Sequence, residues 1–317
     1  MSDLVTFGET MLRLSPPDGE RIEMTDEFSV YAGGAESNVA VAAQRLGTDA
    51  CWISKLPDSP LGDRVVDELR ALGVEVDVVR GGNRQGLYVT ELGGTPRGID
   101  VLYDRTDSAI TTVTPQELPT DRIRDAKCFF TSGITPALSD RLAKTTAQLL
   151  KVADESGTPA ALDVNYRSKL WKPARAREVL TQLFPGIDTL IVPHRDAQTL
   201  FRFERAEPRE VAHGLASQFD FETVVVTRGG HGAIALHNGI VHEQPIFETE
   251  TIDPIGTGDA FTGGFLARQL AGDDVATALA YGAATAALKR TIRGDVATVR
   301  PDEVKRVVEE GTTGISR

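Results

Sequence analysis

Short apolar segments alternate with helix-like segments along most of this 317-residue chain, and this alternation constrains its fold more than any other feature. The apolar segments, which have polar ends, are residues 50–54, 74–79, 129–131, 160–163, 189–192 and 223–227. They have the pattern of strands that are buried on both faces of a sheet. Residues 39–46 and 61–72 have helical patterns that stop at Gly47 and Gly73. We therefore predict an α/β fold with a mostly parallel sheet, whose ligands bind at the carboxyl ends of the strands.

Two segments, residues 11–31 and 86–105, depart from this alternation. Their polar and apolar residues alternate, with glycines between them, as in antiparallel strands outside a main sheet. A small sheet built from such distant segments could form a lid that excludes water from a reacting group. No repeat, low-complexity tract or linker divides the chain, so we expect one domain over residues 1–317 that includes this lid. The exposed edges of the lid favour a homodimer or a larger homo-oligomer.

Charge and apolar run length argue against several classes of function. The formal net charge is −12 and basic residues form no long cluster, so we do not expect binding to nucleic acid or to an anionic membrane. No apolar run approaches the roughly 18 residues of a membrane span, and no signal-peptide pattern is present, which predicts a cytoplasmic protein. Cys51 and Cys128 lie in apolar strands and are expected to be buried thiols. The five histidines lack metal-ligand spacing, so no structural metal is expected.

The strongest chemical motif is the run Asp253-Pro-Ile-Gly-Thr-Gly-Asp-Ala-Phe261. Gly256 and Gly258 can adopt backbone angles that other residues avoid, so the N–H groups of residues 256–258 could converge at the start of a helix and bind an anion. Asp259 lies in the first turn of the helix predicted over residues 260–266. There it could take a proton from a hydroxyl that attacks a bound phosphate. A glycine turn capped by an aspartate would give the same pattern without any chemistry.

Two other motifs follow predicted strands. Asp163, Asn165 and Arg167 come at the carboxyl end of a buried strand, where alternation would direct all three to one side. An amide and a guanidinium there suit a hydroxyl, a carboxylate or a phosphate, although a cap and a surface ion pair would explain them too. The second motif has a threonine and three glycines and could lie along a flat or phosphorylated ligand, or form a hairpin turn; its residues are Thr227, Gly229, Gly230 and Gly232.

A further motif, Gly33-Gly34 with Asn38, precedes the helix predicted over residues 39–46. Taken together, these motifs resemble, in order and over nearly the whole chain, those of the ribokinase-like (PfkB) carbohydrate kinases. Within that family the chain is most similar to the 2-keto-3-deoxygluconate kinases. This closer resemblance rests on Tyr88, on Tyr103-Asp-Arg105 followed by Ser108-Ala109, on residues 163–167 followed by Leu170-Trp171, and on Arg293-Gly-Asp295.

The resemblance implies a three-layer αβα core with a mostly parallel sheet and a small antiparallel β lid. It implies that Asp259 is the general base and that Gly256, Thr257 and Gly258 form the anion hole. The implied sugar-acid contacts are Gly34, Tyr88, Tyr103, Arg105, Arg167, Asp259 and Asp295. The implied nucleotide contacts are Asn165, Arg167, Thr227, Gly229, Gly230, Gly232, Gly256 and Gly258.

The implied reaction is phosphorylation of the terminal primary hydroxyl of 2-keto-3-deoxygluconate by ATP and Mg²⁺, which gives 2-keto-3-deoxy-6-phosphogluconate. Arg105 and the hydroxyls of Tyr88 and Tyr103 could bind the carboxylate of such an acid, for which a neutral sugar has no counterpart. A related kinase for fructose, a nucleoside or a sugar phosphate is the main alternative. A Rossmann dehydrogenase is disfavoured because the glycine motif lacks its third glycine, and a non-catalytic sugar-binding protein is disfavoured by Asp259.

Two departures from the family pattern concern the anion and the metal. Pro254 and Thr257 stand where the family commonly has threonine and alanine, and Thr257 keeps the N–H that the anion hole needs. The Asn-x-x-Glu motif associated with the divalent cation is absent from residues 192–197, where Asp196 could serve through water. The sequence thus predicts no definite set of metal ligands. It also does not distinguish 2-keto-3-deoxygluconate from its C4 epimer.

Overall fold

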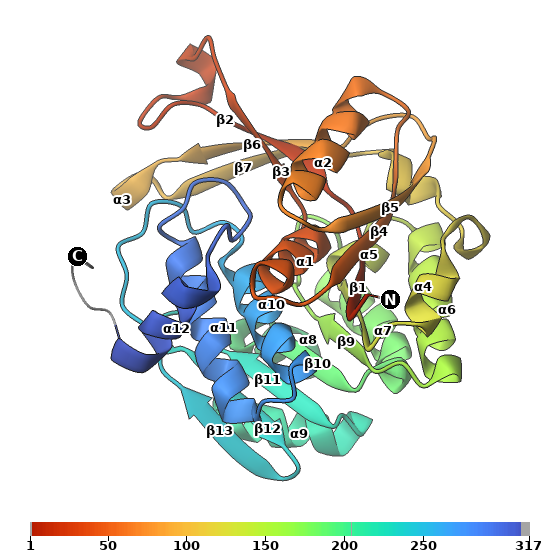
Figure 1. Ribbon diagram of the computed structural model, residues 1–317, viewed down its shortest axis with the longest axis vertical. Helices are drawn as coiled ribbons and strands as arrows, with labels where there is room; N and C mark the ends of the chain where they lie inside the picture. The colour runs from red at the N-terminus through yellow and green to blue at the C-terminus, as the bar shows by residue number, and fades with distance from the viewer. Residues whose placement is uncertain (1, 204, 312–317) are drawn as a thin grey trace.

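The computed structural model describes residues 2–203 and 205–311. Its centre is a nine-stranded sheet (Figure 1). Its strands, in order across the sheet, are β13 (Ile240–Gln244), β12 (Ala233–His237), β11 (Thr223–Thr227), β10 (Thr189–Pro193), β9 (Ala160–Asp163), β8 (Cys128–Ser132), β1 (Leu4–Phe7), β4 (Ala50–Leu56) and β5 (Glu75–Arg80). The strands from β11 to β5 pair in parallel, whereas β12 and β13 extend one edge as antiparallel strands.

Helices cover both faces of this sheet and divide the core into two halves. Along β4, Cys51 and Ile53 face one half, and Ala50 and Trp52 face the other. The first half packs on α4 (Thr120–Arg124), α6 (Asp140–Ser156), α7 (Pro173–Leu183), α8 (His194–Phe201) and α9 (Pro208–Phe219). The second packs on α1 (Ala35–Arg45), α2 (Pro60–Ala71), α10 (Thr257–Leu270) and α11 (Val275–Lys289), with α12 (Pro301–Glu310) against α11. The predicted α/β class and its three αβα layers are confirmed.

A second sheet of four strands lies apart from the first, at the top of Figure 1. Its order is β3 (Ser29–Gly33), β2 (Met11–Ser15), β6 (Leu87–Leu92) and β7 (Ile99–Asp104). These strands come from the two segments predicted to form the lid, and short helix α3 (Gly94–Arg97) joins β6 to β7. The pairs β2–β3 and β6–β7 are antiparallel, as predicted, but β2 and β6 pair in parallel. Between β3 and β6 the chain forms β4 and β5 of the main sheet, and it then runs along β6 in the same direction as along β2.

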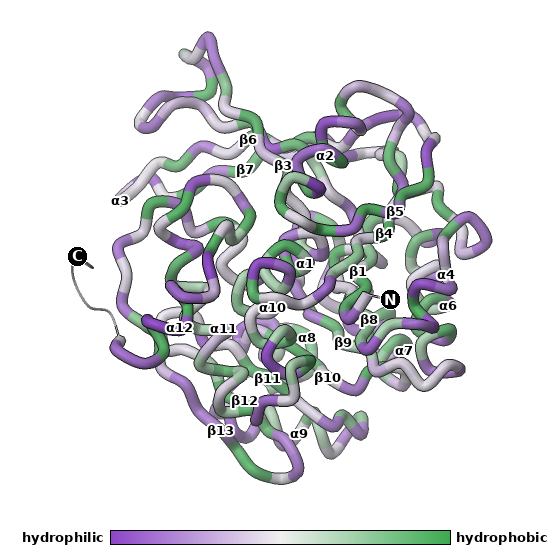
Figure 2. The backbone as a smooth tube through the Cα atoms, in the orientation of Figure 1, coloured by the Kyte–Doolittle hydropathy of each residue, from purple (hydrophilic) through white to green (hydrophobic). Residues whose placement is uncertain are grey.

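The predicted elements agree with the structure except at their ends. Strands β9 and β11 begin and end where the sequence predicts. Helix α1 begins four residues before its predicted start, because Gly34 serves as its N-cap with extended backbone and residues 35–38 form its first turn. Cys51 and Cys128 are buried free thiols in β4 and β8, as predicted. Hydrophobic segments gather at the central strands and hydrophilic ones at the periphery (Figure 2). None of the helices in the described ranges combines the length and the apolar character needed to cross a bilayer.

Candidate active site

A cleft of about 900 Å³ opens between the small sheet and the carboxyl ends of the main strands. Residues from β6, β7, the start of α1, the loop after β9 and the start of α10 line it. Twelve of the fifteen residues predicted for the site line this cleft: Gly34, Tyr88, Tyr103, Arg105, Asn165, Arg167, Thr227, Gly256, Thr257, Gly258, Asp259 and Asp295. The structure thus brings together residues that are up to 261 positions apart in the sequence.

The three remaining predicted residues, Gly229, Gly230 and Gly232, do not line the cleft. Gly229 and Gly230 lie in an exposed 3-10 turn that follows β11. Gly232 has φ +83°, and a Cβ there would overlap the carbonyl oxygen of Gln244 at the end of β13. The turn into β12 by itself therefore explains why residue 232 is a glycine, which agrees with the interpretation of this motif as a hairpin turn. A nucleotide contact from these glycines stays a prediction.

The loop before α10 turns at Gly256, as the motif requires, but the N–H groups that it offers differ from the predicted set of residues 256–258. Gly256 is the N-cap of α10 with φ +80°, and a Cβ there would overlap the carbonyl oxygen of Asp295. The N–H groups of Gly258 and Asp259 belong to the first helical turn and have no partner within the helix. The Thr257 N–H is directed to the Pro254 carbonyl at 3.3 Å. The N–H groups available to an anion are therefore those of Gly258 and Asp259 more than that of Thr257, at the positive end of the helix dipole.

Asp259 is half-buried at the edge of the cleft and is held by one side chain. Asn38 Nδ2 donates a hydrogen bond of 2.7 Å to Asp259 Oδ2, and Asn38 Oδ1 accepts from the Gly34 N–H at 3.3 Å. Removal from water raises the pKa of Asp259 to about 6, although Asn38 and the charge of Arg167 lower it. A carboxylate with this pKa is ionised at neutral pH and is still basic enough to accept a proton. Asn38 belongs to the glycine motif at the start of α1, and nothing in that motif predicts its contact with Asp259, which is 221 positions away.

A second carboxylate, Asp163, lies deeper in the cleft. Burial and the charge of Asp259 raise the pKa of Asp163 to about 8. Its Oδ1 accepts from the Asn165 N–H at 3.0 Å, and Asn165 has φ +39°, a left-handed conformation that asparagine tolerates. Strand alternation therefore ends at Asp163, so the reason given for placing residues 163, 165 and 167 on one side is wrong, although all three line the cleft. Asp196 is buried beside them and accepts from the Tyr166 N–H at 3.2 Å.

Arg105 was predicted to offer its charge to a substrate carboxylate, but an internal partner already shares that charge. Its Nε donates to Glu9 Oε2 at 2.8 Å, and its Nη2 donates to the same oxygen. Glu9 follows β1 and is buried. The Arg105 guanidinium also lies 5.7 Å from the centre of the Tyr103 ring, and Lys169 Nζ lies 5.8 Å from that ring. Nothing in the sequence pattern signals the Glu9 contact, because the two residues are 96 positions apart.

The Tyr88 hydroxyl, predicted as a second donor, is also occupied. It donates to Oδ2 of Asp295, and Oδ1 of the same carboxylate accepts from Arg13 Nη1 at 2.8 Å. Arg13 Nη1 lies 2.8 Å from Asp253 Oδ2 as well, and all four side chains are buried. Burial and the Asp295 charge raise the pKa of Tyr88 well above its ordinary value. Asp295 therefore links Tyr88 in the small sheet to the loop before α10 through Arg13, a residue that the sequence analysis missed.

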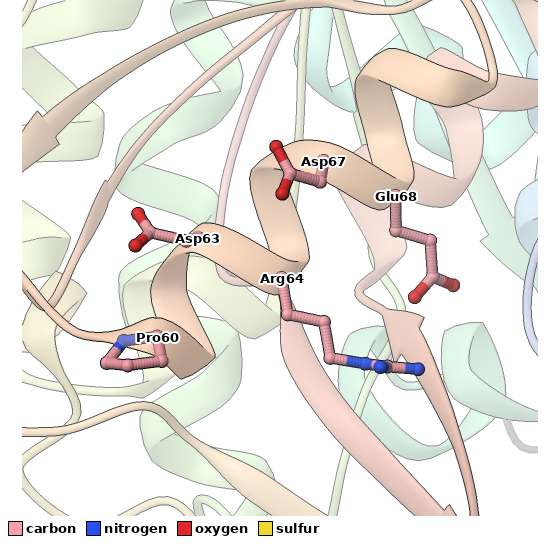
Figure 3. A pocket seen from close by; sticks show the side chains of 5 residues that line it. All are labelled: Pro60, Asp63, Arg64, Asp67 and Glu68. Carbon is pink, nitrogen blue, oxygen red and sulfur yellow. The ribbon is translucent and has the colours of Figure 1, made fainter.

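A second hollow lies along α2 and is lined by Pro60, Asp63, Arg64, Asp67 and Glu68 (Figure 3). Arg64 and Glu68 point the same way in Figure 3, and both bind the backbone of β3. Arg64 Nη2 donates to the Val30 carbonyl at 3.0 Å, and Glu68 Oε1 accepts from the Ala32 N–H at 2.9 Å. These side chains attach the small sheet to α2, and the hollow has no part in the cleft.

Known proteins resemble this chain along nearly its whole length. The family described as "pfkB family carbohydrate kinase" matches residues 1–301. A 2-dehydro-3-deoxygalactonokinase of Haloferax volcanii is 58% identical over 100% of this chain and 99% of its own length. The crystal structure of a 2-dehydro-3-deoxygluconokinase from Thermotoga maritima is 35% identical, with a TM-score of 0.92 over 97% of this chain and 99% of that one.

A more distant structure shares the fold alone. The fructokinase of Xylella fastidiosa, crystallised with bound ATP, is 22% identical with a TM-score of 0.85 over 98% of this chain and 99% of that one. The match to the family covers almost all of the chain, and the Haloferax and Thermotoga proteins align with it nearly end to end. The chain belongs to the pfkB family of carbohydrate kinases.

Proposed function

We propose that this carbohydrate kinase transfers the γ-phosphoryl group of ATP to the terminal primary hydroxyl of a 2-keto-3-deoxy sugar acid. The observation that carries the proposal is that one cleft holds both Asp259, beside the cradle of α10, and the cations Arg105 and Lys169. The first candidate substrate is 2-keto-3-deoxygluconate, the substrate in the name of the Thermotoga protein. The second is its C4 epimer, which the name of the 58% identical Haloferax relative favours.

In the proposed reaction, the hydroxyl oxygen of the sugar acid attacks the γ-phosphorus while Asp259 takes the hydroxyl proton. The bond from the γ-phosphorus to the bridging oxygen breaks, and ADP leaves with that electron pair. The N–H groups of Gly258 and Asp259, and the exposed guanidinium of Arg167 that lines the same cleft, would stabilise the charge on the transferred group. A pKa of about 6 leaves Asp259 ionised at neutral pH.

The cleft also suits a divalent cation bound with the nucleotide. Asp163 has a pKa of about 8 because its charge is buried next to that of Asp259, and a nearby cation would relieve this repulsion. The described residues contain no group of three or more side chains placed to ligate a metal. Mg²⁺ commonly uses one or two carboxylates, water and phosphates, so Asp163, with Asp196 behind it, would be sufficient. When bound, Mg²⁺ would neutralise phosphate charge.

The carboxylate of the sugar acid is assigned to the end of the cleft near Tyr103. Arg105 uses Nε and Nη2 for Glu9, and within the described ranges its Nη1 makes no hydrogen bond. The Nη1 group can therefore donate to a ligand. Lys169 Nζ donates to the Val101 carbonyl at 2.8 Å and adds a second positive charge beside the ring of Tyr103. A carboxylate beside these two cations would be favoured over a neutral hydroxyl.

A substrate panel tests the proposal. ADP release with MgATP should be measured for 2-keto-3-deoxygluconate, its C4 epimer, fructose, ribose and fructose 6-phosphate. We expect the two sugar acids to exceed the neutral sugars in kcat/KM, and Asp259→Asn to abolish release with all substrates while the variant stays folded. A preference for fructose or ribose would overturn the substrate class. Near-normal turnover by the folded Asp259→Asn variant would overturn the assignment of the base.

A further inference from the structure

Lys289 is a fully buried lysine beside the cradle, and none of the steps above uses it. It is the last residue of α11, and its side chain is 0% exposed. Its Nζ donates to the Asp253 carbonyl at 3.1 Å and to the Ile292 carbonyl at 3.0 Å. A buried ammonium is strongly destabilising unless its charge and its N–H groups are matched. The two carbonyls accept N–H groups of Lys289 and so stabilise its ammonium at this position.

Of the two carbonyls that Lys289 binds, one belongs to the loop before α10 and the other to a loop that packs against it, and we call these two the cradle loops. The first loop runs over residues 253–256 and ends at the N-cap of α10. The second runs over residues 292–295 and ends at Asp295, whose carbonyl oxygen lies against Gly256. A single ammonium therefore fixes both loops at the point where their backbones meet.

The Asp253 side chain reinforces this junction. Its Oδ1 accepts from the Ile255 N–H and its Oδ2 from the Gly294 N–H, both at 3.1 Å. Loss of the Lys289 ammonium would leave the carbonyls of Asp253 and Ile292 without this donor, inside the protein. Because unpaired buried carbonyls are unfavourable, the loops would be expected to shift and change the direction of the N–H groups in the cradle.

Charge balance provides a second, independent reason. The buried cations Arg13 and Lys289 face the buried carboxylates of Asp253 and Asp295, from β2, α11 and the two loops. Loss of Lys289 would leave this cluster with one excess negative charge. Asp259 feels the same field: the charges of Lys289 and Arg167 and the Asn38 hydrogen bond favour its ionised form, whereas Asp295 opposes it. Other titratable groups also face the cluster: Tyr88 faces Asp295, Arg293 faces Asp253, and the Tyr31 ring lies beside Arg13.

We propose that Lys289 is a positioning residue for phosphoryl transfer: its ammonium fixes the two cradle loops and helps to keep Asp259 ionised. The inference rests on the proposed role of Asp259 as the general base. Under this proposal Lys289 affects turnover as well as stability. Removal of the charge must then change the pH dependence of turnover as well as its rate.

The test compares Lys289→Met and Lys289→Gln with a matched control, Lys55→Met. Lys55 is also nearly buried, but it pairs with Glu117 at 2.6 Å and does not line the cleft. With MgATP and 2-keto-3-deoxygluconate, kcat/KM should be measured from pH 5 to 9 and unfolding followed by circular dichroism. Because the charge of Lys289 lowers the pKa of Asp259, both variants should move the acidic limb of the profile to higher pH, whereas Lys55→Met should leave it in place.

The two variants separate charge from positioning. Glutamine keeps an N–H donor for one carbonyl, so Lys289→Gln should retain more kcat than Lys289→Met at high pH. An unshifted acidic limb in the folded variants would overturn the inference. If the methionine variant does not fold, the glutamine variant decides alone. Inactivity of Asp259→Asn combined with an unshifted limb would reject only the role of Lys289, whereas an active Asp259→Asn would reject the proposed base itself.

Discussion

The hydrogen bond from Asn38 to Asp259 should set the pH at which the enzyme becomes active, and Asn38→Ala removes it. The bond is 2.7 Å long and ends on a carboxylate, and Asn38 is buried. A hydrogen bond to a charged group contributes about 1.5–3 kcal/mol, and one pKa unit corresponds to about 1.4 kcal/mol. Its loss should therefore raise the pKa of Asp259 from about 6 by about one to two units.

The expected effect on turnover follows from the ionised fraction of the base. At pH 7, a pKa of about 6 leaves about nine tenths of Asp259 ionised, whereas a pKa of about 7 to 8 leaves about one half to one tenth. Asn38→Ala should therefore reduce kcat/KM up to about tenfold at pH 7 from this cause alone, and the deficit should shrink as pH rises. The sign is fixed because a general base works only when ionised.

The assay is ADP release from MgATP with a saturating and a limiting sugar acid, measured from pH 5 to 9. Ser37→Ala is the matched control, because Ser37 is buried on the same helical turn and donates to the Gly34 carbonyl at 3.1 Å, without contact to Asp259. An acidic limb that stays near pH 6 in folded Asn38→Ala would refute the reasoning. A uniform loss at every pH would instead mean that Asn38 acts on the substrate and not through the pKa of Asp259.

Three further predictions concern the cradle, the buried acid and the cation. Gly256→Ala should cost about 1–3 kcal/mol of stability and most of the activity, because φ is +80° and the Asp295 carbonyl occupies the space of a Cβ; chemical denaturation and ADP release measure the two effects. Asp163 keeps its proton up to about pH 8 in the folded state, whereas in the unfolded state it loses the proton at about pH 4. Without metal, the free energy of unfolding should therefore fall as pH rises from about 4 to 8. Asp163→Asn should flatten that slope, and an unchanged slope in urea titrations would contradict the assigned pKa. Arg105→Leu should raise KM for the sugar acid about tenfold or more and leave that for fructose unchanged, whereas equal changes for both would argue against a carboxylate contact.

Much of the fold could be predicted because its strands are buried on both faces. Such strands, β9 and β11 among them, are short apolar runs, and the local pattern marks their ends. The parallel pairing of β2 with β6 could not be predicted, since no local signal records from which side a strand is entered. The start of α1 was misplaced for a related reason: its cap is the backbone of Gly34, not a capping side chain.

The site was predictable as a set of positions but not as a set of contacts. Gly256 and Asp259 are recognisable because a positive φ and an acid at a helix start restrict the residue types. The pairing of Arg105 with Glu9 and of Tyr88 with Asp295 joins residues 96 and 207 positions apart, and it depends on how the two sheets meet. These pairings occupy groups of Arg105 and Tyr88 that were predicted to bind the substrate.

Contacts from outside the motif explain why a glycine turn followed by an acid is not by itself a kinase site. The direction of the cradle N–H groups depends on Asp253, which Arg13 binds from β2 and Lys289 binds from α11. The charge of Asp259 depends on Asn38 from α1. Three separate elements therefore set the geometry and the pKa of a short motif that none of them belongs to. A substitution at any of these three supports should alter the acid–base behaviour of Asp259 without a change in the motif itself, which is why the pH profile discriminates between the proposals better than the rate at a single pH.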